Sequence, residues 1–363
     1  MKVRIISRPI APPWDSGSMN MAYGISSHLN PKNHLVYIPT ANRFQPTYEH
    51  IIPEPIYSTR QFNLTQKLHL IKHLFTAPQV DILHFFFGVT PLSAKLFSAI
   101  KRYKKQPSIL TLTHLPVKGA KPGSFGDYIV TYSTYFKKIF EDSGIKNVVT
   151  IPPGVDVKAI HPNISGIKAG NKLGIPSDAK VILYGGEYSH SAAISMLLKA
   201  ITLTAKRNKN IYFVLACRIR SKYEQKRKQD IVRYLQSVPW AENVILLDTI
   251  PNMHALIARS DVCILPLQDT YGKVDLPLFL LEAMSIAKPI IITDISPVNE
   301  LMIDKIGLAV PLDDANALTN AIEQMVAEGK QYGLRGRRIA EKYFSLDRIT
   351  KQYAKLYAEL LDE

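Results

Sequence analysis

Cysteine and long apolar runs are both scarce in this 363-residue sequence. Its two cysteines, Cys217 and Cys263, lie in apolar, strand-like surroundings, so we expect reduced core residues of a cytoplasmic protein rather than a disulfide or a metal pair. No apolar run approaches the ~20 residues that span a bilayer. The opening residues MKVRIIS enter a strand-like pattern directly, which is unlike a secretory signal. These absences predict a globular protein with no membrane-spanning helix.

Acidic residues are few in the first half of the chain. Residues 1–160 hold 19 of the Lys and Arg residues but only 8 of the Asp and Glu residues, so most of the net charge of +15 lies there. A basic face could meet anionic lipid or an anionic glycan, whereas no nucleic-acid-binding motif appears. The expected helix over 91–105 allows two interpretations: it rests on an anionic membrane, or it covers a sheet and exposes a solvated basic end. A peripheral location at the inner face of a membrane is therefore possible.

Strand-like and helical segments alternate along the chain. We expect strands at 3–7, 34–38, 80–86, 108–113, 128–132, 148–151, 180–185, 211–216, 244–248, 261–265, 289–293 and 307–310. Helices are expected at 18–29, 64–75, 91–105, 133–142, 191–206, 222–236, 252–259, 277–286 and 313–328, with one or two more over 335–362. Such alternation predicts the α/β class, with parallel sheets covered by helices on both faces.

The length suggests two domains on a prior of ~150 residues each. A stretch rich in Pro, Gly, Lys and Asn follows residue 151 and reads as a linker between them. We therefore place an N-terminal Rossmann-like domain at 1–155, a C-terminal Rossmann-like domain at 156–335 and terminal helices at 336–363. Two doubly wound domains of this kind would face a cleft.

Residues 276–300, LPLFLLEAMSIAKPIIITDISPVNE, are the most informative segment. They read as a short helix, a turn, a strand buried on both faces and a polar loop. Asp275 is the expected N-cap, and Pro277 suits the first turn. Glu282 is the only charged residue inside the helix. A lone carboxylate there, beside the carboxyl end of a strand, lies where open α/β sheets bind ligands.

This segment closely resembles the donor-binding motif of the retaining, nucleotide-sugar-dependent glycosyltransferases of family four (glycosyl transferases group 1). Four further stretches resemble the family in the right order: 148–157, 260–267, 307–322 and 344–360. The resemblance implies a GT-B architecture and transfer of a sugar from a nucleotide-diphosphate sugar to a hydroxyl of a glycan or lipid-linked acceptor. It also implies no essential metal and no cofactor beyond the co-substrate, an acceptor-side first domain, a donor-side second domain, and terminal helices that cross back to the first domain.

The resemblance assigns Glu282 to the ribose hydroxyls of the donor. Backbone amides near Leu278 and Phe279 would face the diphosphate. The family has another glutamate eight residues before the one that Glu282 matches, but Val274 stands there in this sequence. Asp275, one residue on, could substitute for it.

Two residues of the first domain also match the family. Gly17, between the first strand and the first helix, resembles part of its glycine-rich loop, which usually has two adjacent glycines. His114 matches a histidine at a strand end close to the donor sugar. The resemblance implies that both close over the sugar. The alternatives are an ordinary strand–helix turn for Gly17 and a polar loop histidine for His114.

The stretch YGGEYSHSAA at 184–193 departs from the family. Gly186 matches a family glycine, but Glu187 replaces an arginine and Ala192 a lysine, both of which bind the donor diphosphate. Three explanations stay open. In the first, Lys273, Arg218 or Arg220 binds the diphosphate instead, and Glu187 pairs with Arg218 or binds a sugar hydroxyl. In the second, the donor lacks a nucleotide diphosphate. In the third, transfer activity is lost and only binding remains.

The sequence therefore supports three hypotheses. The first is a metal-independent glycosyltransferase with Glu282, Asp275 and His114 in the catalytic site. The second is a non-catalytic sugar- or nucleotide-binding protein on the same fold. The third is a basic membrane- or nucleic-acid-associated protein whose cleft is vestigial.

Overall fold

The computed structural model describes the chain except for Asp15, Asn42, Thr113, 117–125, Arg220, Thr249, Pro251, 270–274 and Glu363. Two candidate site residues, Arg220 and Lys273, lie outside the described residues, as does Val274. The chain divides into two compact units. Unit 1 comprises residues 1–156, 271–276 and 344–363, and unit 2 comprises 157–270 and 277–343.

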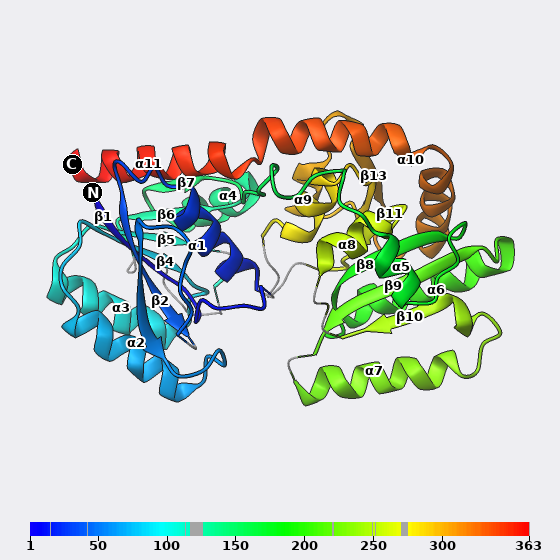
Figure 1. Ribbon diagram of the computed structural model, residues 1–363, viewed down its shortest axis with the longest axis horizontal. Coiled ribbons are helices and arrows are strands. Elements are labelled where there is room, and N and C mark those ends of the chain that lie inside the picture. The colour runs from blue at the N-terminus through cyan, green and yellow to red at the C-terminus, as the bar shows by residue number, and fades with distance from the viewer. Residues whose placement is uncertain are drawn as a thin grey trace. The chain divides into compact units, whose positions relative to one another are not determined.

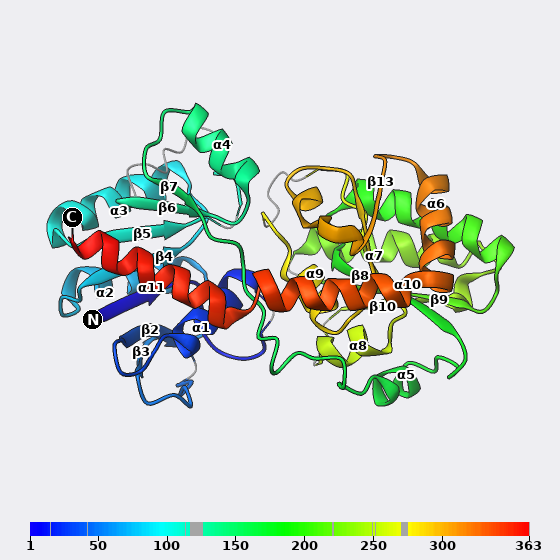
Figure 2. The ribbon, with the colours of Figure 1, turned by 90° about the horizontal axis from the view of Figure 1, so that it is seen from above.

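Unit 1 contains a parallel sheet in the order β3-β2-β1-β4-β5-β6-β7. Its strands are β1 (Lys2–Ile6), β2 (Leu35–Ala41), β3 (Ile51–Tyr57), β4 (Ile82–Phe86), β5 (Ser108–Thr111), β6 (Tyr128–Thr131) and β7 (Val148–Thr150). Its helices are α1 (Gly17–His28), α2 (Leu64–Thr76), α3 (Pro91–Lys104), α4 (Thr134–Asp142) and α11 (Leu346–Asp362). Figures 1 and 2 show α11 along one face of this sheet, with α2 and α3 on the other.

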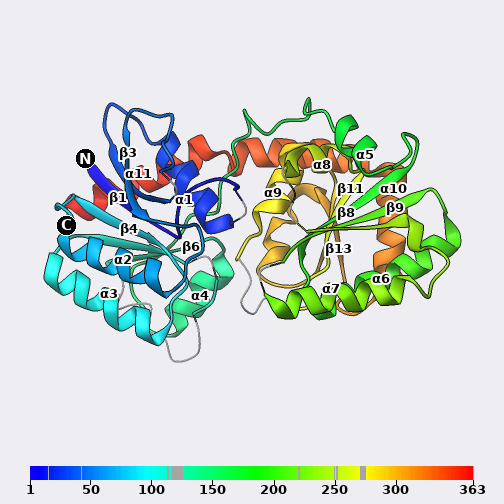
Figure 3. The same cartoon turned by 60° about the horizontal axis from the view of Figure 1, so that its bottom comes forward.

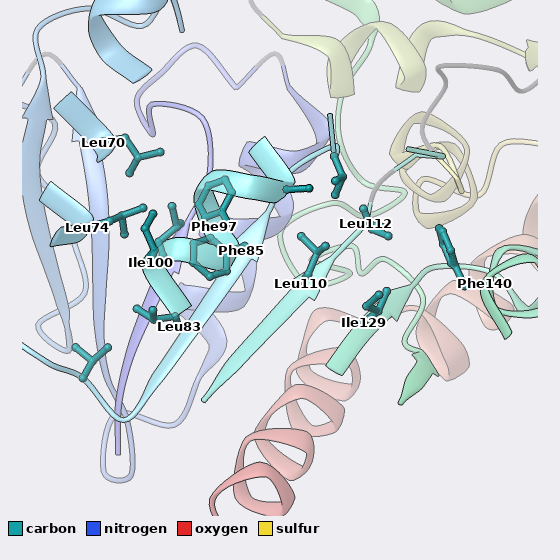
Figure 4. Close-up of a cluster of buried hydrophobic side chains, with 14 of the residues drawn as sticks. Leu70, Leu74, Leu83, Phe85, Phe97, Ile100, Leu110, Leu112, Ile129 and Phe140 are labelled. Carbon is teal, nitrogen blue, oxygen red and sulfur yellow. The ribbon is translucent and has the colours of Figure 1, made fainter. Parts of the chain in front are cut away.

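Alternation along β4 builds both faces of that sheet. Leu83 and Phe85 point into an apolar core that α2, α3 and α4 complete (Figure 4). His84 points to the opposite face, where its Nδ1 lies 2.6 Å from the Tyr357 hydroxyl of α11 and its Nε2 lies 2.8 Å from Thr111 Oγ1. Thr111 also bonds Tyr353 of α11, at 3.1 Å. Polar pairing inside an apolar interface thus ties the terminal helix to this sheet.

Unit 2 contains a parallel sheet in the order β10-β9-β8-β11-β12-β13. Its strands are β8 (Lys180–Glu187), β9 (Ile211–Arg218), β10 (Val244–Leu247), β11 (Val262–Leu265), β12 (Ile290–Thr293) and β13 (Gly307–Val310). Its helices are α5 (Ile167–Lys172), α6 (Ser191–Arg207), α7 (Lys222–Leu235), α8 (Met253–Arg259), α9 (Leu278–Ser285) and α10 (Ala315–Tyr343). Short 3₁₀ turns lie at Ala241–Asn243, Val298–Leu301 and Ile303–Lys305. Figures 1 and 3 place α6 and α7 on one face and α8 on the other.

The predicted fold class is confirmed, and the differences are local. Strand β3 was not expected from the sequence, because its IIPEPIY carries two prolines. Proline is tolerated in a sheet mainly on an edge strand, and β3 is an edge strand. The sequence analysis also missed α5. The segments 313–328 and 335–362 are divided differently: α10 runs unbroken to Tyr343, and α11 follows.

Glycines explain why α10 is longer than expected. Gly329 and Gly333 suggest a helix end, yet both are buried inside α10. A Cβ on Gly333 would lie 2.0 Å from the Ala287 carbonyl oxygen, and one on Gly329 would lie 2.7 Å from Pro289. Both glycines therefore let α10 approach the turn between α9 and β12 closely. Among the helices of the described residues, none combines the length and apolarity needed to cross a bilayer.

Candidate functional site

Glu282 lies in α9, which follows β11 in unit 2. This eight-residue helix begins at Leu278 with Pro277 as its N-cap, and no side chain caps its first amides. The Glu282 carboxylate is 17% exposed, and its Oε1 lies 3.6 Å from Nε2 of His254 in α8. A carboxylate accepts up to about four hydrogen bonds, so Glu282 keeps acceptor capacity beyond its contact with His254.

The expectation that Asp275 caps α9 is wrong. Asp275 belongs to unit 1, where it is buried and its Oδ2 accepts hydrogen bonds from the backbone amides of Tyr132 (2.8 Å) and Ser133 (2.9 Å). These amides immediately precede α4, whose N-cap is Ser133. The carboxylate therefore stabilises the start of α4, a long-range contact that sequence spacing does not reveal.

The carboxyl ends of β8 and β9 bring Glu187 and Arg218 together. The two residues are partners in the strand register, and Arg218 Nη2 donates to Glu187 Oε1 at 3.0 Å. Ser189 Oγ donates to Glu187 Oε2 at 3.2 Å, and His190 Nε2 lies 3.7 Å from the same oxygen. The expected pairing of Glu187 with Arg218 is thus present. Because the partners are 26% and 33% exposed, solvent screens this pair and it adds little to stability.

Two glycines shape the end of β8. A Cβ on Gly185 would lie 2.5 Å from the ring of Phe279, and one on Gly186 would lie 2.3 Å from the Tyr184 ring. Aromatic rings therefore rest directly on the strand backbone. The close approach of Phe279 to Gly185 positions the first turn of α9 beside the end of β8. Leu278 and Phe279 therefore lie close to the strand end that holds Gly186, and the diphosphate contact that the resemblance implies for this region stays a prediction.

His254 and His190 were not among the predicted site residues. Burial lowers the pKa of His254, but the hydrogen bond and charge of Glu282 outweigh it, and the net effect raises the pKa. The position of His254 could have been recognised in the sequence, because it comes a few residues after the predicted strand at 244–248. Ligands of parallel α/β sheets bind near the carboxyl ends of strands. His190 lies within the aberrant YGGEYSHSAA stretch, and its Nδ1 is 3.3 Å from the Tyr184 hydroxyl.

His114 and Gly17 lie in unit 1. The His114 ring covers Gly88, because a Cβ there would lie 2.1 Å from His114 Nε2. Burial, followed by the charge of Arg8, lowers the pKa of His114, so its imidazole is neutral at pH 7. Gly17 is the first residue of α1, and the hydroxyls of Ser16 and Ser18 beside it are 3.3 Å apart. The assigned contact with a donor sugar stays a prediction for both residues.

The described residues contain no group of three or more His, Cys, Asp or Glu side chains placed to hold a metal ion. Buried Cys217 and Cys263 are free thiols. Burial raises the pKa of the Cys263 thiol to about 12, which fits an unreactive core residue.

Solved structures identify the fold as GT-B. A glycosyltransferase from Rickettsia africae matches with a TM-score of 0.77 and 17% identity, over 99% of this chain and 98% of that chain. Sucrose-phosphate synthase from Thermosynechococcus elongatus matches with 0.78 and 16%, over 99% of both chains. HepE of Anabaena, solved with UDP-glucose, matches with 0.77 and 17%, over 99% of this chain and 100% of that chain. At these identities the likeness shows the fold alone.

The sequence comparison matches one family model over part of the chain. Residues 179–328, which hold Glu187, Arg218, His254 and Glu282, match the model of "Glycosyl transferases group 1". Among curated proteins, none matches this sequence. The resemblance seen in the sequence is confirmed for this part of the chain.

Proposed function

We propose that this protein is a retaining glycosyltransferase that moves a sugar from a nucleotide-diphosphate sugar to a hydroxyl of a glycan or lipid-linked acceptor, without a metal. The observation that carries the proposal is Glu282, a partly exposed carboxylate on the helix after β11, inside the region that matches the family model. HepE was solved with UDP-glucose, and Arabidopsis starch synthase IV with ADP and acarbose. Nucleotide-linked sugars are therefore the donors to test.

The departures at Glu187 and Ala192 favour a second candidate, a sugar- or nucleotide-binding protein without transfer activity. A carboxylate facing a diphosphate is repelled by it. In this chain Arg218 pairs with Glu187, so the negative charge at the end of β8 is offset, but part of the Arg218 charge is used for this purpose. If the remaining positive charge of Arg218 is too small to bind a diphosphate, two interpretations are favoured. One is the second candidate, and the other is a donor without a diphosphate.

Replacing Glu282 tests the donor site. We expect Glu282→Gln to weaken binding of the preferred nucleotide by about tenfold to a hundredfold, because a carboxylate accepts stronger hydrogen bonds from ribose hydroxyls than an amide does. Calorimetry would measure this after a thermal-shift screen of UDP, GDP, ADP, CMP and their sugars without added metal. The matched control is Glu328→Gln, which removes the same charge from an exposed position of α10. Equal affinities of wild type and Glu282→Gln would contradict the site.

Transfer itself needs a separate measurement. Incubation with a labelled donor and an acceptor panel should yield a product, and its anomeric configuration by NMR should match that of the donor if transfer is retaining. Nucleotide binding with neither hydrolysis nor transfer of the donor would favour the second candidate. Activity that is lost with EDTA and restored by a divalent cation would contradict the proposed metal independence.

We further propose that the outer surface of α2 and α3 contacts an anionic membrane from the cytoplasmic side. Both helices expose large apolar side chains beside basic ones. The exposed fractions are 72% for Leu64, 56% for Leu68, 78% for Leu92 and 65% for Tyr103. The neighbouring exposed basic residues are Lys67, Lys72, Lys95, Arg102 and Lys105. The two helices lie side by side (Figures 1 and 3), and Phe75 contacts Tyr103 between them. Apolar insertion together with positive charge is the pattern of interfacial helices, and it would favour a lipid-linked acceptor.

A further inference from the structure

His254 occupies a fixed position beside Glu282. It lies in the first turn of α8, where the Asn252 side chain accepts a hydrogen bond from the Ala255 amide at 2.9 Å and so caps the helix. Its Nε2 is 3.6 Å from Glu282 Oε1. The imidazole is 38% exposed, so a ligand can reach it. Two separate helices thus present a histidine and a carboxylate to each other.

The protonated form of His254 is stabilised by Glu282, although other features of its surroundings disfavour it. Partial burial disfavours an imidazolium, and the positive end of a helix dipole adds to that effect. The net pKa is nevertheless raised, because Glu282 stabilises the protonated ring. The contact with Glu282 therefore favours the protonated form of His254.

A cation at this place would favour the binding of a nucleotide donor. Glu282 would meet the ribose, whose attached phosphates carry negative charge, so the carboxylate and the phosphates would repel each other. The family's two phosphate-binding cations are replaced by Glu187 and Ala192, and Arg218 is paired with Glu187. An unpaired Glu282 would add to the repulsion. A counter-ion on Oε1 reduces it and leaves Oε2 to accept from the ribose.

We propose that His254 is a donor-positioning residue: it orients the Glu282 carboxylate for the ribose and offsets its charge against the donor's phosphates. The inference rests on the proposed function, and it assigns to His254 part of the charge that the absent family cations would supply. The ligand class is a ribonucleotide whose affinity depends on its phosphates. Because His254 acts through Glu282 in this role, we expect it to affect donor binding more than the chemical step.

The test compares ligands that share a base but differ in phosphates. Calorimetry at pH 7 would measure Kd for the nucleoside, the nucleoside monophosphate and the nucleoside diphosphate of the base that wild type prefers. The variants are His254→Gln, which keeps a hydrogen-bond donor without the charge, and His254→Ala. The matched control is His161→Gln, a half-buried histidine of unit 2 whose Nδ1 accepts only a local bond from the Asn163 amide.

For His254→Gln we expect diphosphate affinity to fall by about threefold to tenfold and nucleoside affinity to stay within about twofold, since a partly exposed charge pair contributes modestly. His254→Ala should lower both affinities, because the carboxylate also loses its orientation. In the Glu282→Gln background, His254→Gln should have no further effect. If transfer is measurable, the KM for the donor should rise while kcat changes little.

Three outcomes would overturn the inference. One is an unchanged diphosphate affinity in both His254 variants. Another is an equal loss of affinity for the nucleoside and the nucleoside diphosphate in His254→Gln, which would indicate a disturbed structure. A lower melting temperature of this variant without ligand would detect the same disturbance. The last is an undiminished effect of His254→Gln in the Glu282→Gln background. If wild type binds no nucleotide at all, the proposed function fails together with the inference, whereas nucleotide binding that is insensitive to His254 removes the inference alone.

Discussion

At the scale of single residues, His84 shows how burial changes ionisation. It is fully buried, it bonds Tyr357 and Thr111, and burial lowers its pKa to about 3 from an ordinary value of 6.5. The folded protein therefore keeps this imidazole neutral at a pH where the unfolded chain protonates it. Its contribution to stability is fully present above about pH 6.5 and is lost progressively as the pH falls toward 3.

The prediction is that His84→Gln is less stable than wild type at pH 7.5, by a few kcal/mol, and that the difference shrinks as the pH falls below 6.5. Urea unfolding between pH 7.5 and 4.5 would measure it. The chain has two tryptophans, Trp14 in unit 1 and Trp240 in unit 2, so a Trp240→Phe background lets fluorescence report on unit 1. The control, exposed His69→Gln, should follow wild type at every pH. A gap between His84→Gln and wild type that stays constant with pH would contradict the assignment.

At the scale of secondary-structure elements, the close contact between β8 and α9 positions the candidate site. Gly185 is required there because the Phe279 ring occupies the space of a side chain. We predict that Gly185→Ala displaces the first turn of α9, lowers the stability of unit 2 by about 1–3 kcal/mol and weakens nucleotide binding. Trp240 fluorescence in a Trp14→Phe background would follow unfolding of unit 2, and calorimetry would follow binding.

Gly336→Ala is the matched control for this prediction. Gly336 lies inside α10, where a new Cβ would be 3.5 Å from Met284, an ordinary contact distance. Alanine is favoured over glycine in a helix interior by up to about 1 kcal/mol, so this variant should be as stable as wild type or more stable, with unchanged binding. If Gly185→Ala behaves in the same way, the tight contact is not essential to the site.

At the scale of the whole molecule, the charge distribution predicts a membrane partner for unit 1. The protein should co-sediment with vesicles containing phosphatidylglycerol and not with purely phosphatidylcholine vesicles, and added salt should release it. Lys95→Glu with Arg102→Glu should weaken vesicle binding by at least about tenfold, and Leu64→Ser with Leu92→Ser should weaken it with less change in salt dependence. The control is Leu334→Ser, which removes an exposed leucine from unit 2. Binding that ignores lipid charge would refute the proposal.

Local pattern determined most of the secondary structure and the fold class. Strands buried on both faces read as apolar runs, and the helices between them carry apolar stripes and recognisable ends, so these segments can be placed without knowing their partners. The motif around Glu282 also depends on residues adjacent in sequence. The errors came where a partner distant in sequence overrides local preference. An edge position tolerates the prolines of β3, and close helix packing requires the glycines of α10.

Only the tertiary structure decided what the individual charges do. Asp275 looks like a helix cap from its position, but its carboxylate stabilises the start of α4 in unit 1. For Glu187 the sequence left two partners open, Arg218 or a sugar hydroxyl, and the strand register places Arg218 beside it. The sequence places His254 after a predicted strand, but its contact with Glu282 joins two different helices and follows only from the folded arrangement. Hydrogen bonds and ion pairs depend on distances of a few ångströms between segments far apart in the chain, and only the folded arrangement sets those distances.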